Sequence, residues 1–448
     1  MAKSTLEDLL DFIRHPSIST DPSYNEAMRQ CAEWLKTWFE GKKITAEIHQ
    51  TAGHPVVLAE TPKIAGAPTV LIYGHYDVQP VDPLELWDSH PFDPTVKDGI
   101  ITARGATDNK GQIMAHMQGV AELLERGELA LNVIFLIEGE EEIGSPNLTP
   151  FLEAQRDRLA CDVVVVSDTG MVGPGVPTMT YGLRGVAALE VVFHGPSMDL
   201  HSGMYGGAVM NPATALARVL AKMHDDQLRV AIPGFYDEVK PLEAWEREAW
   251  AKLPVSEETY VKLSGAPALD GEAGYSAVER IAGRPTAEIN GLTSGYQGVG
   301  TKTVLPSQAR AKITFRLTPH QDPEKILLAA EQFFRDHASP AVTVVVERGH
   351  YAAAYYVDPH AGFAKEAQSA LKSTWGREPA LVREGGSIPI VQVFKDALGV
   401  ETLLLGLALP DCRAHSPNET FPIENYEKGI LLNQNLLQNI TNATVSAG

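Results

Sequence analysis

The order and spacing of three segments in the first third of the chain limit its possible folds more than any other feature of the sequence. Residues 69–73 and 131–137 are short, mostly apolar runs, and residues 111–124 between them carry apolar residues at helical spacing. A helix between two apolar strands is typical of a parallel sheet, because such strands are covered on both faces. Apolar runs at 162–166 and 402–405 predict further strands. We therefore predict an α/β fold with a mixed, largely parallel sheet and helices on both faces.

A different pattern fills the middle of the chain. Residues 185–193 and 308–317 alternate apolar and polar side chains, as half-buried strands do. Helical spacing follows each of them, at 212–223 and 323–337, and another strand is expected at 341–347. This order predicts an α+β, ferredoxin-like layer that is separate from the α/β part.

The length of the chain also favours two domains. At 448 residues it exceeds the size at which one hydrophobic core usually stops growing. Because the helix and strand alternation resumes after residue 350, we predict that residues 1–183 and 351–448 form one metal-binding domain. Residues 184–350 would then form an inserted lid and dimerisation domain. Residues 224–285 are charged, aromatic and irregular, and their pattern predicts no structure.

Charge and cysteine content exclude several classes of partner. The net charge of -20 argues against nucleic acid and anionic membranes as main partners. Charged residues interrupt positions 1–18, which therefore do not read as a signal peptide, and no apolar run reaches transmembrane length. Three scattered cysteines, Cys31, Cys161 and Cys412, are too few for a disulfide framework or a thiolate zinc site. A cytoplasmic protein is expected.

The strand at 69–73 leads directly into His75 and Asp77. Residues two apart in an extended chain point to the same side, so both can face one site. A metal-bound imidazole normally donates its other N–H to a carboxylate, which fixes the tautomer. The pair is therefore a candidate metal ligand and its orienting partner; taken alone, it is more often a hydrogen-bonded pair at a strand end.

Two acidic motifs have similar alternatives. Asp108 lies in a glycine-bracketed loop before the expected helix at 111–124, where an aspartate is commonly the helix N-cap. That loop lacks the Gly-Lys-Ser/Thr ending of a phosphate-binding loop. Four glutamates fall within residues 138–142, next to an apolar strand, where mutual repulsion favours a bound cation. The alternative is a solvated acidic turn.

Asp168 follows the strand at 162–166, and His415 lies beyond the strand at 402–405. Ligands of open α/β sheets gather at the carboxyl ends of strands. Two imidazoles and three carboxylates would converge there, which suffices for two metals that share one carboxylate.

Several longer stretches match a known family. They are Gly74-His75-Tyr76-Asp77-Val78-Gln79-Pro80, the Asp108 loop, Glu141-Glu142, Ser167-Asp168, Asp199-Leu200-His201-Ser202-Gly203, Lys302-Thr303-Val304, Arg383-Glu384-Gly385-Gly386 and Ala414-His415-Ser416. As a set they resemble the co-catalytic metallopeptidases that include cytosolic non-specific dipeptidase, carnosinase, carboxypeptidase G, aminoacylase and succinyl-diaminopimelate desuccinylase. The dipeptidase and carnosinase branch is the most similar.

The resemblance implies the roles of the central residues. One metal would be bound by His75, Asp108 and Asp168, and the other by Asp108, Glu142 and His415. It implies that Glu141 is the general base that takes a proton from water to form a hydroxide bridging the metals. It also implies that Asp77 is the partner of His75. It also implies a cis peptide bond between Asp108 and Asn109. Two divalent ions per subunit are expected, with zinc the first choice and manganese or cobalt the alternatives.

The inserted domain would complete the site. In relatives, the counterpart of His201 reaches the active site of the other subunit, so the resemblance implies a homodimer joined through the insert. Arg316, His350 and Ser387 resemble the groups that receive the free carboxylate of the substrate. Taken singly, His201, His350 and Arg316 would more often be domain-interface residues, and only their motif context favours a functional role.

Asp168 helps to choose among the activities of the family. Aspartate at this position is typical of its aminopeptidase and dipeptidase members, whereas glutamate is typical of carboxypeptidases and deacylases. The leading hypothesis is a dipeptidase-like metallopeptidase acting on small peptides. The alternatives are an N-acyl-amino-acid amidohydrolase with the same chemistry and an inactive metal-binding scaffold, which the presence of Glu141 disfavours.

Overall fold

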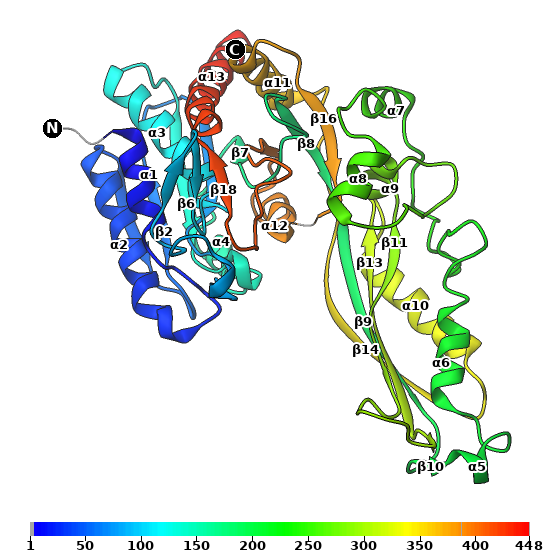
Figure 1. The fold of residues 1–448 in the computed structure, drawn as a ribbon. Coiled ribbons are helices and arrows are strands. Elements are labelled where there is room, and N and C mark those ends of the chain that lie inside the picture. Colours follow the sequence, from blue (N-terminus) through cyan, green and yellow to red (C-terminus); the bar gives the residue numbers. More distant parts are fainter. Residues whose placement is uncertain (1–3, 387, 448) are drawn as a thin grey trace. The chain divides into compact units, whose positions relative to one another are not determined.

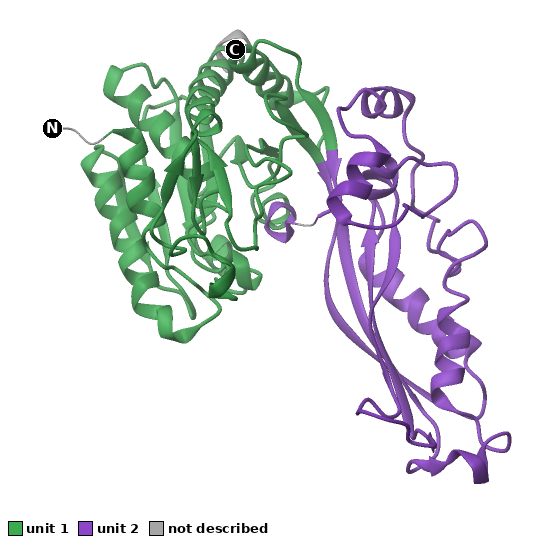
Figure 2. Cartoon of the chain, viewed as in Figure 1, with its two compact units in different colours: residues 1–181, 357–382, 393–448 green, residues 182–356, 383–392 purple. Residues whose placement is uncertain are grey.

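The computed structural model describes residues 4–386 and 388–447. The chain forms two compact units, shown in Figure 2: residues 1–181, 357–382 and 393–448 make unit 1, and residues 182–356 and 383–392 make unit 2. The sequence pattern had placed residues 383–392 with the metal-binding domain. In the structure they group with unit 2, where the Arg184 side chain donates to the Gly385 carbonyl and the Arg383 side chain pairs with Glu246.

Unit 1 is built around a mixed sheet (Figure 1). Its strands run in the order β1 (Thr45–His49), β2 (Val56–Glu60), β6 (Asn132–Glu138), β3 (Thr69–His75), β7 (Val163–Val166), β17 (Thr402–Leu404) and β8 (Thr178–Leu183). The four central strands, β6, β3, β7 and β17, are parallel, and β1, β2 and β8 are antiparallel to their neighbours. Two short strands, β15 (Tyr355–Tyr356) and β16 (Ala380–Glu384), also pair with β8.

Helices cover both faces of this sheet. Ile72 of β3 and Phe135 of β6 are register partners and share one face, where the Phe39 ring of α2 (Asn25–Gly41) packs on Phe135. The next residue, Tyr73, points to the opposite face and contacts Phe394 of α12 (Pro389–Leu398). The predicted fold class is confirmed.

The other elements of unit 1 complete these layers. The remaining helices are α1 (Thr5–Ile13), α3 (Lys110–Arg126), α4 (Leu148–Ala154), α11 (Gly362–Trp375) and α13 (Ile423–Ala447), with 3-10 turns at Pro22–Tyr24, Leu84–Leu86 and Glu141–Ile143. A small sheet joins β4 (Thr95–Lys97), β5 (Ile100–Thr102) and β18 (Thr420–Pro422). Helix α1 begins with the capping box that the sequence suggests, formed by Ser4 and Glu7.

Unit 2 contains the expected ferredoxin-like layer. Its order along the chain is β9 (Gly185–His194), α6 (Pro212–Leu220), β11 (Thr286–Ser294), β13 (Gln308–Leu317), α10 (Pro323–His337) and β14 (Thr343–Ala352). The sheet order is β11-β13-β9-β14, antiparallel throughout, and α6 and α10 pack on it. Residues 224–285, whose sequence pattern predicts no structure, contain α7 (Ala244–Trp250), α8 (Glu257–Ser264) and α9 (Ala277–Gly283). Short elements β10 (Leu200–His201) and α5 (Ser202–Tyr205) lie at one end of the layer (Figure 1), and β12 (Val304–Leu305) pairs with β10.

Among residues 4–386 and 388–447, no helix combines the length and the apolar character that a bilayer crossing requires.

Candidate metal centre

His75 ends β3 and is fully buried together with Asp77. The His75 Nδ1 atom lies 3.3 Å from Asp77 Oδ1 and 3.0 Å from the Asp77 carbonyl oxygen. The Asp77 carboxylate also accepts the backbone N–H groups of Glu141 at 3.2 Å and Glu142 at 3.1 Å. Asp77 therefore ties the end of β3 to the turn that follows β6.

Asp108 lies between the two histidines. Its Oδ1 atom is 3.3 Å from His75 Nε2, and its Oδ2 atom is 2.9 Å from His415 Nε2. The peptide bond between Asp108 and Asn109 is cis, as the family resemblance implies. One carboxylate oxygen thus faces each imidazole, which is the arrangement of a bridging ligand.

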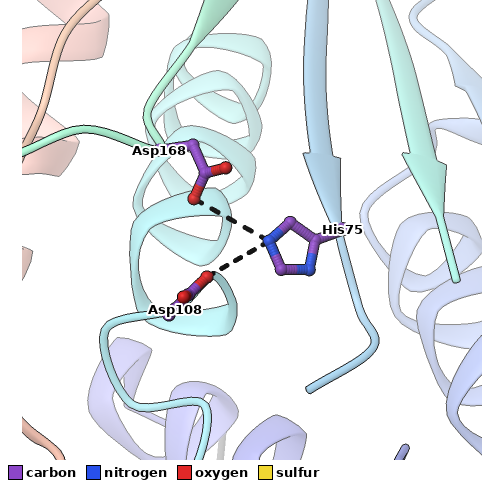
Figure 3. A group of neighbouring side chains, drawn as sticks. All are labelled: His75, Asp108 and Asp168. Carbon is purple, nitrogen blue, oxygen red and sulfur yellow. Dashed lines mark ion pairs between the residues drawn. The ribbon is translucent and has the colours of Figure 1, made fainter. Parts of the chain in front are cut away.

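The structure brings together the five side chains expected to bind metal. Two groups have their donor atoms within 4.8 Å of one another: His75, Asp108 and Asp168, and Asp108, Glu142 and His415. Figure 3 shows Asp108 and Asp168 pointing at the same nitrogen of the His75 ring, with Asp168 Oδ1 at 3.8 Å. In the second group, His415 Nε2 lies 3.5 Å from Glu142 Oε2.

Two buried atoms of these groups show that divalent cations fit here. His75 Nε2 and Glu142 Oε1 have no hydrogen-bond partner among the residues that the structure describes. A buried polar atom without a partner is costly, and both atoms are metal-ligating types on residues of these two groups. Imidazole nitrogen and carboxylate oxygen suit zinc, manganese and cobalt.

Two side-chain amides whose role no sequence pattern indicated support the ligands. The Asn109 amide donates to the Ser167 carbonyl at 2.7 Å and to Asp168 Oδ1 at 2.8 Å. Gln79 donates to Glu142 Oε2 at 2.7 Å. Both residues lie inside the motifs that match the family: Asn109 follows Asp108 directly, and Gln79 belongs to the run that contains His75. Their place in these motifs was the signal that could have identified them.

The acids at this site repel one another in the absence of a cation. Burial, and then the Asp108 charge, raise the pKa of Glu142 to about 8. Burial also raises the pKa of Glu141 well above its ordinary value, and Asp168 and Asp108 act in the same direction. Burial would raise the pKa of Asp108 as well, but the neighbouring His415 and His75 imidazoles hold it below its ordinary value. The charges of the ligand carboxylates therefore contribute to the raised pKa of Glu141.

Three of the remaining expected residues are described by the structure, and all three lie in unit 2. His201 is exposed on β10, and its Nδ1 accepts the Gly203 N–H at 3.0 Å. Arg316, on β13, lines a cavity of about 560 Å³ within unit 2. His350 is exposed at an irregularity of β14. Ser387 lies outside the described residues.

Comparison with known families agrees with this geometry. The model of peptidase family M20/M25/M40 matches residues 71–439, a span that contains every ligand of both groups. The chain belongs to this family. The predicted resemblance is confirmed.

Several known proteins are similar to this chain over most of their length. The Cys-Gly metallodipeptidase of Schizosaccharomyces pombe is 30% identical, covering 93% of this chain and 91% of the relative. The human Beta-Ala-His dipeptidase is 31% identical, over 84% of this chain and 76% of the relative. An M20 metallo-carboxypeptidase from Sulfolobus solfataricus superimposes with a TM-score of 0.86 at 33% identity, covering 98% of this chain and all of that one. Human carnosine dipeptidase 1 gives 0.81 at 27% identity, covering 98% and 96%.

The sharing of Asp108 between the groups predicts the metal content of variants. Asp108→Ala should lose both ions, whereas Asp168→Ala should keep about one of the two ions per chain, because one ligand group stays complete. Metal analysis of purified, zinc-loaded protein would measure this. Glu140→Gln is the matched control, since Glu140 is a neighbouring buried acid held by Asn147, and it should keep both ions. Full metal content in Asp108→Ala would contradict the shared ligand.

A pH dependence is expected for the metal-free protein. Between the ordinary value of 4.5 and about 8, folded Glu142 holds a proton that the unfolded chain releases. The folded state then binds more protons, so the free energy of unfolding falls as pH rises, by on the order of a few kcal/mol. Raised pKa values of His75 and His415 add to this loss above 6.5.

Urea unfolding of the metal-free protein at pH 6 and pH 8 would measure this loss. Glu142→Gln should reduce the difference between the two midpoints, because it removes one of the titrating groups. Zinc should reduce it as well, since a cation favours the ionised carboxylates. A metal-free protein that is more stable at pH 8 than at pH 6 would contradict the prediction.

Proposed function

We propose that this chain is a metal-dependent exopeptidase that hydrolyses the amide bond of dipeptides and similar small peptides. The observation that carries the proposal is the pair of ligand groups sharing Asp108, with Glu141 directly before the ligand Glu142 and its backbone N–H bonded to Asp77. The M20 relatives named as dipeptidases support the substrate class.

Glu141 is the proton carrier in this proposal. When bound, the two ions polarise the substrate carbonyl and lower the pKa of water from about 15.7 towards about 7. Glu141 accepts a proton from the attacking water and delivers it to the leaving amine. Asp77 holds both the His75 ring and the Glu141–Glu142 turn, so it aligns a ligand with the base. Zinc is the ion we propose, because its ligands in hydrolases are imidazole and carboxylate.

Unit 2 would bind the rest of the substrate. Arg316 is the proposed partner of the free carboxylate, because a guanidinium can bind a carboxylate through two hydrogen bonds. Its place on the wall of a cavity supports this role. His350 and Ser387 are proposed to assist by hydrogen bonding.

We also propose a homodimer in which His201 completes the site of the partner subunit and stabilises the oxyanion of the tetrahedral intermediate. Apolar side chains near His201 are exposed, including Met198 at 65% and Met204 at 74%. On the edge strand β11, Leu292 is 60% exposed. Exposed apolar surface of this kind is typical of protein interfaces.

The three cysteines are free thiols, which supports a cytoplasmic location.

A substrate screen separates the dipeptidase from the N-acyl-amino-acid amidohydrolase. Because relatives of this chain are named as dipeptidases, kcat/KM for simple dipeptides should exceed that for N-acetyl amino acids by about tenfold or more. Release of amino acids from zinc-loaded protein would be measured for dipeptides, N-acetyl amino acids and N-succinyl compounds. Equal or faster hydrolysis of the acyl compounds would favour the amidohydrolase.

A further inference from the structure

A buried glutamate that the mechanism above does not use lies against the Asp108 loop. Glu419 is fully buried, and its carboxylate accepts four hydrogen bonds. Oε2 accepts from Arg104 Nη1 at 2.8 Å and from the Gly105 N–H at 2.9 Å. Oε1 accepts the N–H groups of Thr107 at 2.8 Å and Asp108 at 2.9 Å. One side chain thus holds three backbone groups of the loop that ends in the shared metal ligand.

The segment that carries Glu419 is itself fixed in place. The Ala103 N–H donates to the Glu419 carbonyl at 3.0 Å, and Thr107 Oγ1 donates to the Thr420 carbonyl at 2.6 Å. Thr420 is also the register partner of Thr102 in the pairing of β18 with β5. Glu419 follows His415 by four residues, so one segment of chain supplies a metal ligand and holds the loop of another.

A simpler role for Glu419 would be to neutralise Arg104, which is also buried. Arg104 has other contacts, because its Nη2 donates to the Pro80 carbonyl at 3.1 Å and its guanidinium lies 5.4 Å from the Trp87 ring centre. Neutralisation needs one carboxylate oxygen, but here Oε1 accepts two backbone N–H groups. The geometry therefore fits a clamp on the loop better than a counter-ion alone.

We propose that Glu419 is a positioning residue for the metal centre. It fixes the Gly105–Asp108 backbone so that the Asp108 carboxylate presents Oδ1 to His75 and Oδ2 to His415. The inference rests on the metal centre of the proposed function, but not on the identity of the substrate. Preorganisation of a bridging ligand by such a partner commonly changes metal affinity by about 10–100-fold.

Cobalt binding tests this inference without any peptide. Metal-free Glu419→Gln would be titrated with Co²⁺ and followed by visible absorption, at a temperature well below the melting temperature of the variant. The amide group keeps one acceptor oxygen and turns an NH₂ donor towards loop N–H groups or Arg104, so the clamp is broken. We expect the variant to bind Co²⁺ at least about tenfold more weakly than wild type and to show an altered absorption spectrum. Glu419→Asp keeps the charge but shortens the reach, and it decides by the same criterion if Glu419→Gln does not fold.

Asp8→Asn is the matched control for lost stability. Asp8 is another buried acid of unit 1, whose carboxylate accepts from Trp38 at 3.1 Å and Gln118 at 2.9 Å. This variant should lower the melting temperature and leave Co²⁺ affinity and the spectrum as in wild type. Wild-type affinity and spectrum in the folded Glu419 variants would overturn the positioning role. A wild-type protein that takes up no Co²⁺ would overturn the metal centre itself, whereas a wrong substrate class would leave this titration unchanged.

Discussion

Glu141→Gln should lower kcat by about 10²–10⁴-fold while the protein keeps both metal ions. Glutamine has nearly the same shape but cannot accept the proton of the attacking water. Glu141 contributes no atom to either ligand group, so metal content should not change. Turnover of a dipeptide and metal analysis on the same zinc-loaded sample would measure both quantities.

The adjacent residue provides the matched control. Glu142 differs from Glu141 by one position but belongs to the ligand group of Asp108 and His415. Glu142→Gln should therefore lose activity together with metal, whereas Glu141→Gln should lose activity alone. If Glu141→Gln kept near-normal turnover, or lost its metals, the roles assigned to the two glutamates would be wrong.

Mixing two inactive variants should restore activity if His201 serves the site of the partner subunit. His201→Ala and Glu141→Gln are each expected to be nearly inactive, because each lacks one group of every site. A mixed dimer contains one site with both Glu141 and His201 intact. After random subunit exchange about half of the dimers are mixed, so about a quarter of wild-type activity should return.

The measurement is dipeptide turnover before and after mixing, with subunit exchange verified by differently tagged chains. If His201 acts within its own subunit, every site in the mixture carries a defect and no activity returns. Failure to regain activity despite verified exchange would refute the shared site, and it would leave the metal chemistry of unit 1 intact. His201→Ala that is fully active alone would show that this histidine has no catalytic role.

Sequence reasoning succeeded where local pattern and burial agree. The strands of the unit 1 sheet are apolar because both their faces are covered, and that pattern is visible without a structure. It failed for β11, because that strand buries little of its surface: Ile289 is 46% exposed. Helices α7 and α9 are seven residues each, too short for a clear apolar period, although both begin with a capping box.

The four acids at the end of β6 and in the turn after it show what the sequence could and could not determine. Their crowding beside an apolar strand indicated a cation, but composition alone could not say which of them bind it, and the choice of Glu142 came from the family resemblance. In the structure, Glu138 accepts from the Tyr73 hydroxyl at 2.5 Å and from Ser145 at 2.8 Å. Glu140 accepts from Asn147 and from the His54 N–H.

The sequence by itself determined the layered α/β fold, the inserted layer and the residue types at the ends of the central strands, because burial and strand period act locally along the chain. The tertiary structure decided which of those side chains meet. Asp108 and His415 are 307 positions apart, yet their Oδ2 and Nε2 atoms lie 2.9 Å apart. That approach depends on parallel strands placing their carboxyl ends at one edge and on the Glu419 contacts that hold the Asp108 loop there. No local pattern encodes such a distance, because it is the result of packing between segments remote in the chain.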